Sequence, residues 1–207
     1  MKLTPSQRSL LERRTAAYQA SLGLARDYLE GRGFSEGTAR SSRLGVVADP
    51  LPGDERYLGR LSIPYLTRSG VVSIRFRSLE EGVQAKYLGD PGVESRLYNV
   101  EGLFHPEPFV AVAEGELDAL TLSQLGIPAV GVPGATNWKP HYSRIFEDYQ
   151  RVYVFADGDS AGRKFGERVA ESVDGVTVID MPDGMDVGSV YTDMENGAEW
   201  LRRKVRR

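Results

Sequence analysis

The segment VYVFADGDSAGRK, residues 152–164, decides the fold that we predict for this chain. Its apolar run, 152–156, ends in Asp157 and Asp159, and a helical pattern begins near Ser160. A buried strand that leads into a helix is the repeating unit of an open α/β sheet. Ligands bind such sheets beyond the carboxyl ends of the strands. The two aspartates are therefore predicted to lie where a ligand binds.

The same two aspartates allow more than one role. Side chains at i and i+2 of an extended segment point the same way, so Asp157 and Asp159 can face one cation. Alternatively, Asp159 or Ser160 is the N-cap of the following helix. A calcium loop of the EF-hand type is excluded, because Ala161 holds its third ligand position and Arg168 the position of its closing glutamate. Considered without the rest of the sequence, this stretch does not decide between a metal site and an N-cap.

A second stretch, AEGELDAL at residues 113–120, repeats the order of apolar strand, carboxylate, glycine and helix. If its strand is the neighbour of 152–156, Glu114 converges with the two aspartates at one sheet edge, and Asp118 lies one helical turn further on. Crowded like charges are costly unless a cation neutralises them. A carboxylate cluster in a chain with no cysteine and two histidines suits Mg²⁺ or Mn²⁺ rather than zinc.

Composition is that of a globular protein without a membrane span. The chain has 207 residues, with 41% hydrophobic and 27% charged residues. No run approaches the roughly 20 apolar residues that cross a bilayer, and the N-terminus has no apolar signal core. We expect a cytoplasmic protein, in the host cytoplasm if a phage encodes it. Residues 1–100 carry 15 Lys and Arg against 11 Asp and Glu, and residues 101–207 carry 11 against 18. A basic half beside an acidic half suits a protein that holds a polyanion and cations.

The chain divides into two parts with different patterns. Residues 1–100 open with a helical pattern from Pro5 to about Tyr28 and then show the period of two that is typical of strands. From residue 109 onward, strands alternate with helices, one of them expected from Tyr142 to Tyr149. Such alternation predicts a parallel sheet covered by helices on both faces. The predicted parts are a basic α+β subdomain over 1–100, an α/β domain over 101–190 and a C-terminal helix over 191–207.

Three motifs in the second part resemble those of the Toprim domain. They carry that domain's glutamate, its Asp-x-Asp pair and its trailing acidic residue in the same order: AEGELDAL (113–120), DGDSAGRK (157–164) and PDGMD (182–186). Segments of the first part are similar to the RNA-polymerising core of bacterial and phage-type DNA primases: YLEGRGFSEGTARSSRLG (28–45), IPYLTRSGVVSIRFRS (63–78), AKYLGDP (85–91) and RLYN (96–99). The resemblance implies a Toprim-like parallel sheet flanked by helices, preceded by a smaller basic α+β subdomain.

The resemblance also assigns roles to residues. It implies that Glu114, Asp157 and Asp159 are catalytic and bind Mg²⁺ or Mn²⁺, with Asp118 and Asp186 as further metal ligands. The residues that it implies for binding of template or nucleotide are Arg75, Arg77, Lys86, Tyr87, Arg163 and Lys164. The chain departs from the family at two positions. Gly89 stands where the family usually has asparagine, and Gly188 stands where it usually has a second aspartate.

The function that the resemblance implies is synthesis of short RNA primers on single-stranded DNA by two-metal-ion nucleotidyl transfer. Residues 1–100 then form the template and nucleotide groove, and residues 101–190 the metal-binding Toprim domain. The implied partners are single-stranded DNA, NTPs, a separate zinc-binding-domain protein and a replicative helicase. Two alternatives stay open: a metal-dependent nuclease built on the same domain, and a non-catalytic DNA-binding subunit. A topoisomerase is not expected, because 207 residues leave no room for a strand-passage gate.

Overall fold

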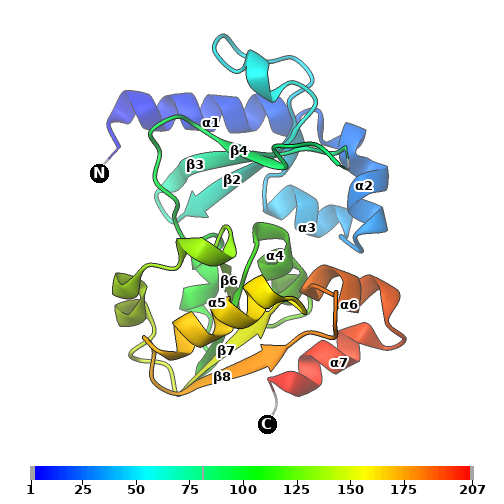
Figure 1. Cartoon of the computed structure of the whole chain (residues 1–207). Coiled ribbons are helices and arrows are strands. Elements are labelled where there is room, and N and C mark those ends of the chain that lie inside the picture. The colour runs from blue at the N-terminus through cyan, green and yellow to red at the C-terminus, as the bar shows by residue number, and fades with distance from the viewer. Residues whose placement is uncertain (1–2, 81, 206–207) are drawn as a thin grey trace. The chain divides into compact units, whose positions relative to one another are not determined.

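The computed structural model describes residues 3–80 and 82–205. The chain forms two compact units, Met1–Glu94 and Ser95–Arg207, which we call the N-terminal unit and the C-terminal unit. The sequence patterns predict the boundary between the two parts after residue 100, six residues later than the boundary in the structure. None of the described helices is long and apolar enough to cross a membrane. Figure 1 follows both units in chain order.

The N-terminal unit begins with a helix that is shorter than predicted. Helix α1 (Pro5–Gln19) starts at Thr4, whose side chain forms a capping box with Gln7. The prediction of a continuous helix to about Tyr28 is wrong. The chain turns after Gln19 and continues through the 3₁₀ helix η1 and helix α2, because a strand residue, Gly45, packs against the backbone of Tyr18. The other helices of this unit are η1 (Leu22–Ala25), α2 (Arg26–Gly31), α3 (Glu36–Ser41) and η2 (Glu55–Tyr57).

A four-stranded antiparallel sheet completes this unit, in the order β1-β2-β3-β4. The period of two predicted its two long strands and the turn between them, and the structure confirms both. The last strand, β4, has only three residues and pairs with β3 alone, so it is an edge strand. The strands are β1 (Gly45–Val46), β2 (Leu61–Thr67), β3 (Gly70–Arg77) and β4 (Tyr87–Gly89).

The two faces of β3 have different neighbours. Ile74 and Phe76 point into a core with Leu11 and Tyr18 of α1 and with Tyr57. Arg75 and Arg77 alternate with these residues and therefore lie on the opposite face, as the alternation in the sequence predicted.

The C-terminal unit contains a parallel sheet in the order β6-β5-β7-β8. This confirms the predicted parallel α/β sheet and the predicted adjacency of the strands that precede Glu114 and Asp157. Strands β5 and β6, and β7 after Arg151, are short apolar runs, as expected where both faces of a sheet are covered, whereas the edge strand β8 is mostly exposed or half-buried. The strands are β5 (Phe109–Ala113), β6 (Ala129–Gly131), β7 (Arg151–Ala156) and β8 (Val176–Asp180).

Helices cover this sheet and connect its strands (Figure 1). The helix predicted from Tyr142 to Tyr149 is wrong. This stretch forms 3₁₀ turns that begin at Pro140, because Tyr142 and Phe146 must both pack beside Trp138 within a short connection to β7. The α-helices of the unit are α4 (Glu116–Gln124), α5 (Ser160–Ala170), α6 (Val187–Asp193) and α7 (Gly197–Lys204). The 3₁₀ helices are η3 (Val100–Phe104), η4 (Ala135–Asn137) and η5 (Pro140–Ile145).

One core cluster fixes α5 against the sheet. Val112 of β5 and Val154 of β7 contact this cluster together with Phe165 and Val169 of α5. The intervening strand residues, such as Phe155, are also fully buried, so both faces of the sheet are covered. The carboxyl ends of β5 and β7 are thereby held side by side.

Two phenylalanines of this unit provide a matched test of the core. Phe165 is 0% exposed and Phe104 is 56% exposed. We expect Phe165→Ala to lower the free energy of unfolding by about 3–5 kcal/mol, because it removes a buried ring and leaves a cavity. Phe104→Ala is expected to change it by less than about 0.5 kcal/mol. Urea unfolding followed by circular dichroism measures both, and equal losses would contradict the packing described above.

Candidate functional site

Two carboxylate-bearing strand ends meet at one edge of the C-terminal sheet. In the parallel register, Ala113, the last residue of β5, lies opposite Phe155 of β7, and β7 ends one residue later at Ala156. The next residues are Glu114 and Asp157, and the Glu114 Oε1 atom accepts a hydrogen bond of 3.1 Å from the Asp157 backbone amide. The sheet therefore brings together two residues that are 43 positions apart in the sequence.

Two loops are pressed together beside this contact. The Gly158 amide donates to the Met185 carbonyl at 2.8 Å, and the Gly184 amide donates to the Gly158 carbonyl at 2.8 Å. A β-carbon on Gly158 would lie 1.9 Å from the Pro182 carbonyl oxygen, so only glycine fits there. Glycine at this position therefore allows the close approach of the PDGMD turn.

Two of the aspartates cap helices. The Asp159 Oδ1 atom accepts hydrogen bonds of 2.8 Å from the amides of Ala161 and Gly162 at the start of α5. The Asp186 Oδ1 atom accepts one of 2.6 Å from the Ser189 amide at the start of α6. The N-cap alternative for Asp159 is therefore correct for one of its two oxygens.

A fifth carboxylate belongs to the same edge. The Asp118 Oδ1 atom on α4 accepts a hydrogen bond of 3.2 Å from the Gly188 amide. Gly188 is the position at which the resembling family usually has a second aspartate, so here a backbone amide faces Asp118 instead. We call the five carboxylates the acidic edge: Glu114, Asp118, Asp157, Asp159 and Asp186.

Within the acidic edge, the pKa of the Asp157 carboxyl is strongly raised. Burial raises the pKa of its carboxyl to about 8, and repulsion from the other four carboxylates of the acidic edge adds to this rise. Burial also raises the pKa of Glu114, although the bond from the Asp157 amide opposes the rise. The Asp157 Oδ1 atom is buried and accepts no hydrogen bond. An unpaired carboxylate oxygen in such a place is costly unless something positively charged binds it.

The side chains of the acidic edge are not arranged around a single metal position in this structure. Within residues 3–80 and 82–205, no three His, Cys, Asp or Glu side chains are arranged to hold a metal ion. Asp159 and Asp186 each turn one oxygen toward helix amides, and Glu114 turns one toward the amide of Asp157. The donor set nevertheless fits a hard divalent cation, because it consists of carboxylates with one buried oxygen unpartnered.

In the N-terminal unit, arginines and tyrosines stack on the face of β3 that lies away from α1. The Arg77 Nη1 atom donates a hydrogen bond of 2.6 Å to the Tyr87 hydroxyl. The guanidinium carbons of Arg75 and Arg77 lie 4.7 and 5.2 Å from the centre of the Tyr87 ring. Arg77 also lies 5.6 Å from the ring of Tyr28. Burial opposes the charge of Arg77, but the two tyrosines outweigh it and raise the Arg77 pKa.

The predicted nucleotide-binding residues differ in how exposed they are and in the unit to which they belong. Arg77 is buried and Arg75 and Tyr87 are half-buried, whereas Lys86 is exposed at the start of β4. Arg163 and Lys164 are exposed in the first turn of α5 and belong to the C-terminal unit. Tyr28 was not among the predicted residues, although it opens the segment YLEGRG on which the resemblance partly rests.

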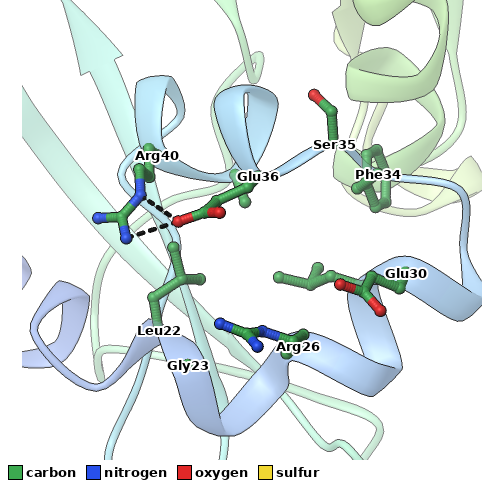
Figure 2. A pocket seen from close by; sticks show the side chains of 10 residues that line it. Leu22, Gly23, Arg26, Glu30, Phe34, Ser35, Glu36 and Arg40 are labelled. Carbon is green, nitrogen blue, oxygen red and sulfur yellow. Dashed lines mark hydrogen bonds and ion pairs between the residues drawn. The ribbon is translucent and has the colours of Figure 1, made fainter.

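A small hollow in the N-terminal unit contains none of the predicted site residues. It measures about 70 Å³ and lies between η1, α2 and α3. Figure 2 shows Arg26 and Glu30 on one side of it and the ion pair of Glu36 and Arg40 on the other. Its floor consists of buried apolar side chains such as Leu29.

Comparison with known proteins shows relatives of the whole chain and of its second half. Residues 111–191 match a family described as Toprim-like. The chain is 42% identical over 147 residues to the Gene 57 protein of Mycobacterium phage D29, covering 69% of this chain and 96% of that protein. It is 29% identical over 165 residues to the DNA primase of Aquifex aeolicus, covering 72% of this chain and 32% of that enzyme. The chain thus spans about a third of the length of this bacterial primase.

Solved structures show the same fold. The DnaG primase catalytic domain bound to single-stranded DNA matches with a TM-score of 0.75 and 24% identity, over 95% of this chain and 80% of that one. The zinc-binding and RNA polymerase domains of Aquifex aeolicus primase match with a TM-score of 0.78 and 23% identity, over 98% of this chain and 61% of that one. These two structures show the fold alone. The Toprim-like match, the phage relative and the sequence likeness to bacterial DNA primase show that the chain belongs to the family of Toprim-domain DNA primase catalytic cores.

Proposed function

We propose that this chain synthesises short RNA primers on single-stranded DNA by nucleotidyl transfer. The observation that carries the proposal is the unpartnered, buried carboxylate oxygen of Asp157 among four further carboxylates, in a chain of the primase family. Such a group serves no purpose in packing, and it suits the binding of cations that act on phosphates.

We propose Mg²⁺ or Mn²⁺ as the cofactor, held by Glu114, Asp157 and Asp159 with support from Asp118 and Asp186. When bound, such ions activate a 3′ hydroxyl and neutralise charge on the phosphoryl group that is transferred. The protein's own contribution is to hold the carboxylates in place. The amide of Asp157 orients Glu114, and the caps on α5 and α6 orient Asp159 and Asp186.

The basic groups are proposed to hold the nucleic acid and the nucleotide. Arg75 and Lys86 contact phosphates, because both carry exposed or half-exposed positive charge on the β3–β4 face. Tyr87 offers a ring for stacking of a base, with Arg77 holding its hydroxyl. Arg163 and Lys164 bind the phosphates of the incoming nucleotide beside the acidic edge, because they follow the cap residue Asp159 by about one helical turn.

The proposed partners follow from the same comparison. The Aquifex aeolicus structure joins zinc-binding and RNA polymerase domains, and the present chain has no cysteine. By likeness to that structure and to the family, we propose a zinc-binding-domain protein as a partner for the choice of initiation sites, and a replicative helicase as the recruiting partner. Single-stranded DNA and NTPs are the proposed substrates.

The first prediction tests the reaction. Wild-type protein incubated with single-stranded template, four NTPs and Mn²⁺ or Mg²⁺ is expected to make short RNA, with and without an added zinc-domain protein. Asp157→Ala/Asp159→Ala should lower the yield by at least about 1000-fold, because it removes the cation-binding groups. Asp183→Ala is the matched control, since Asp183 is an exposed acid in the PDGMD turn, and it should stay within about twofold.

The products on a sequencing gel separate the alternatives for this reaction. Degradation of nucleic acid by the wild type with metal but without NTPs would favour the nuclease. Retained DNA binding without any product, even with the zinc-domain protein, would favour a non-catalytic subunit. Equal yields from the wild type and the double variant would show that the catalytic assignment is wrong.

The second prediction concerns stability and pH. The pKa of Asp157 is about 8 in the folded protein and near 4 in an unfolded chain. A raised folded pKa contributes stability that is present below pH 4 and is lost as pH rises toward 8. In metal-free buffer, Asp157→Asn should therefore melt higher than the wild type by more than about 2 °C at pH 8, and this gap should shrink toward pH 4.

The metal provides the control for this experiment. Added Mn²⁺ should raise the melting temperature of the wild type at pH 8 and leave that of Asp157→Asn nearly unchanged. Calorimetry at several pH values measures both effects. A gap between the two proteins that does not depend on pH would contradict the raised pKa.

The third prediction tests the basic face. Each phosphate contact with single-stranded DNA contributes about 0.7 to the slope of log affinity against log salt concentration. Arg75→Ala and Lys86→Ala should each reduce this slope by about 0.7, as measured by fluorescence anisotropy with labelled DNA. Arg13→Ala removes an exposed charge from α1 and should leave the slope unchanged. Equal effects of all three variants would mean that binding follows net charge and not the β3–β4 face.

A further inference from the structure

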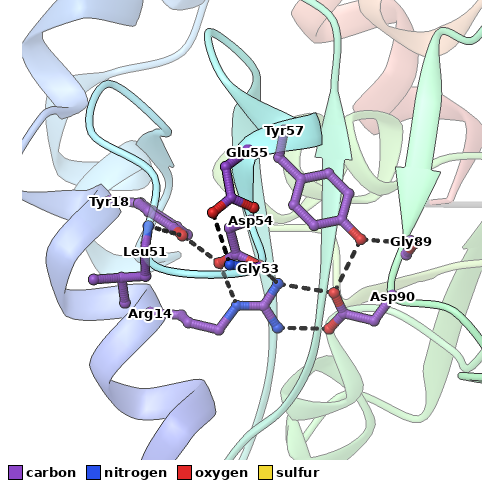
Figure 3. Close-up of polar contacts among 9 residues, drawn as sticks. All are labelled: Arg14, Tyr18, Leu51, Gly53, Asp54, Glu55, Tyr57, Gly89 and Asp90. Atoms are coloured by element: carbon purple, nitrogen blue, oxygen red, sulfur yellow. Dashed lines mark hydrogen bonds and ion pairs between the residues drawn. The ribbon is translucent and has the colours of Figure 1, made fainter.

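A buried charge cluster in the N-terminal unit ties three distant segments together (Figure 3). Arg14 of α1 donates two hydrogen bonds to Asp54, of 2.7 and 2.8 Å. It donates two more to Asp90, of 2.6 and 2.8 Å. All three nitrogens of the Arg14 guanidinium thus donate hydrogen bonds to these two carboxylates. Asp54 precedes η2, and Asp90 directly follows β4.

Two tyrosines complete this cluster. The Tyr18 hydroxyl donates to Asp54, and the Tyr57 hydroxyl lies 3.0 Å from the Gly89 carbonyl and 3.1 Å from Asp90 Oδ1. Burial and the neighbouring carboxylates raise the pKa of each tyrosine to about 12, so both hydroxyls keep their protons and remain donors. Burial opposes the charge of Arg14, and the two aspartates raise its pKa.

The cluster acts on a short edge strand of the sheet. Strand β4 has three residues, and its backbone pairs with β3 on one side only. Its C-terminal end is held by Tyr57 at Gly89 and by Arg14 at Asp90. Its N-terminal end is held by Arg60, whose Nη1 atom donates to the Ala85 carbonyl at 2.9 Å. A strand this short has little stability of its own, so side chains fix its position.

Two of the predicted substrate contacts of this unit, Lys86 and Tyr87, lie just before β4 and at its first position. In the register of the sheet, Tyr87 lies opposite Arg77, and Lys86 directly precedes it. A slip of one residue would turn Tyr87 to the other face of the sheet and break its bond with Arg77. The position of the proposed stacking and phosphate-binding groups therefore depends on how β4 is anchored.

We infer that Arg14, Asp54, Asp90 and Tyr57 form a clasp that positions β4, and with it Lys86 and Tyr87, for binding of nucleotide and template. This inference rests on the proposed function. The members of the clasp are positioning residues, because they act through β4. Removing Asp90 leaves Arg14 bound to Asp54 and releases only the end of β4, so the effect is expected on binding more than on folding.

The test uses Asp90→Asn in the full chain, with Tyr57→Phe as a second variant that changes no charge. Glu36→Gln is the matched control, because it breaks an exposed ion pair between Glu36 and Arg40 in the same unit. Five quantities are measured: hydrogen exchange of the amides in 86–90, KM for NTPs in primer synthesis, kcat, Mn²⁺ affinity by electron paramagnetic resonance, and the melting temperature.

We expect Asp90→Asn to speed exchange in 86–90 and to raise KM about tenfold, with kcat and Mn²⁺ affinity within about twofold of the wild type. Tyr57→Phe should act in the same direction and less strongly, and Glu36→Gln should change nothing. Asp90→Glu, which keeps the charge, should restore part of the lost affinity. A role in stability alone would lower the melting temperature without moving KM.

The outcomes keep this inference separate from the proposed function. Faster exchange in 86–90 with an unchanged KM would overturn the clasp, as would a fall in kcat at constant KM. If the wild type makes no RNA, the proposed polymerase fails, and the clasp is judged by binding of single-stranded DNA. In that case, weaker binding by both Asp90→Asn and Tyr57→Phe supports the clasp, and unchanged binding by both overturns it.

Discussion

The parallel pairing of β5 with β7 is the constraint on which the acidic edge depends. Because Ala113 lies opposite Phe155, the residues that follow the two strands meet, and Glu114 accepts a hydrogen bond from the Asp157 amide. Small residues then allow the loops to close over this contact, with Gly158 under the Pro182 carbonyl. The pairing of two apolar strands thus determines where charged groups gather, although no charged group takes part in that pairing.

The geometry of the acidic edge has a cost in stability. The carboxyl of Asp157 is buried, its Oδ1 atom lacks a partner, and four other carboxylates repel it. An asparagine of the same shape would avoid the charge, so packing does not explain the aspartate. The proposed cation binding does explain it, because the penalty disappears when the ion is bound. Function and stability therefore make opposite demands on this one side chain.

Local patterns predicted much of the fold, and long-range packing decided the rest. Apolar runs identified the strands of the parallel sheet, and the carboxylates beside glycines identified the edge of the sheet at which acidic side chains gather. The helix predicted from Pro5 to about Tyr28 was wrong, because Gly45 meets the Tyr18 backbone from a distant segment. The N-cap alternative for Asp159 is correct for one of its oxygens, which caps α5. Metal binding by Asp159 stays a prediction.

The cluster around Arg14 shows why the sequence of residues 1–100 did not predict which of its charged side chains are buried. Its partners Asp54 and Asp90 lie 40 and 76 residues away, so no local pattern joins them. A net charge summed from the sequence treats Arg14, Asp54 and Asp90 as if all three were exposed to solvent. In the structure, Arg14 and two aspartates form an internal group with an excess of one negative charge. The remaining residues of 1–100 therefore carry one more positive charge than the total suggests. Internal pairing therefore leaves the rest of this part of the chain more positive than its total charge suggests.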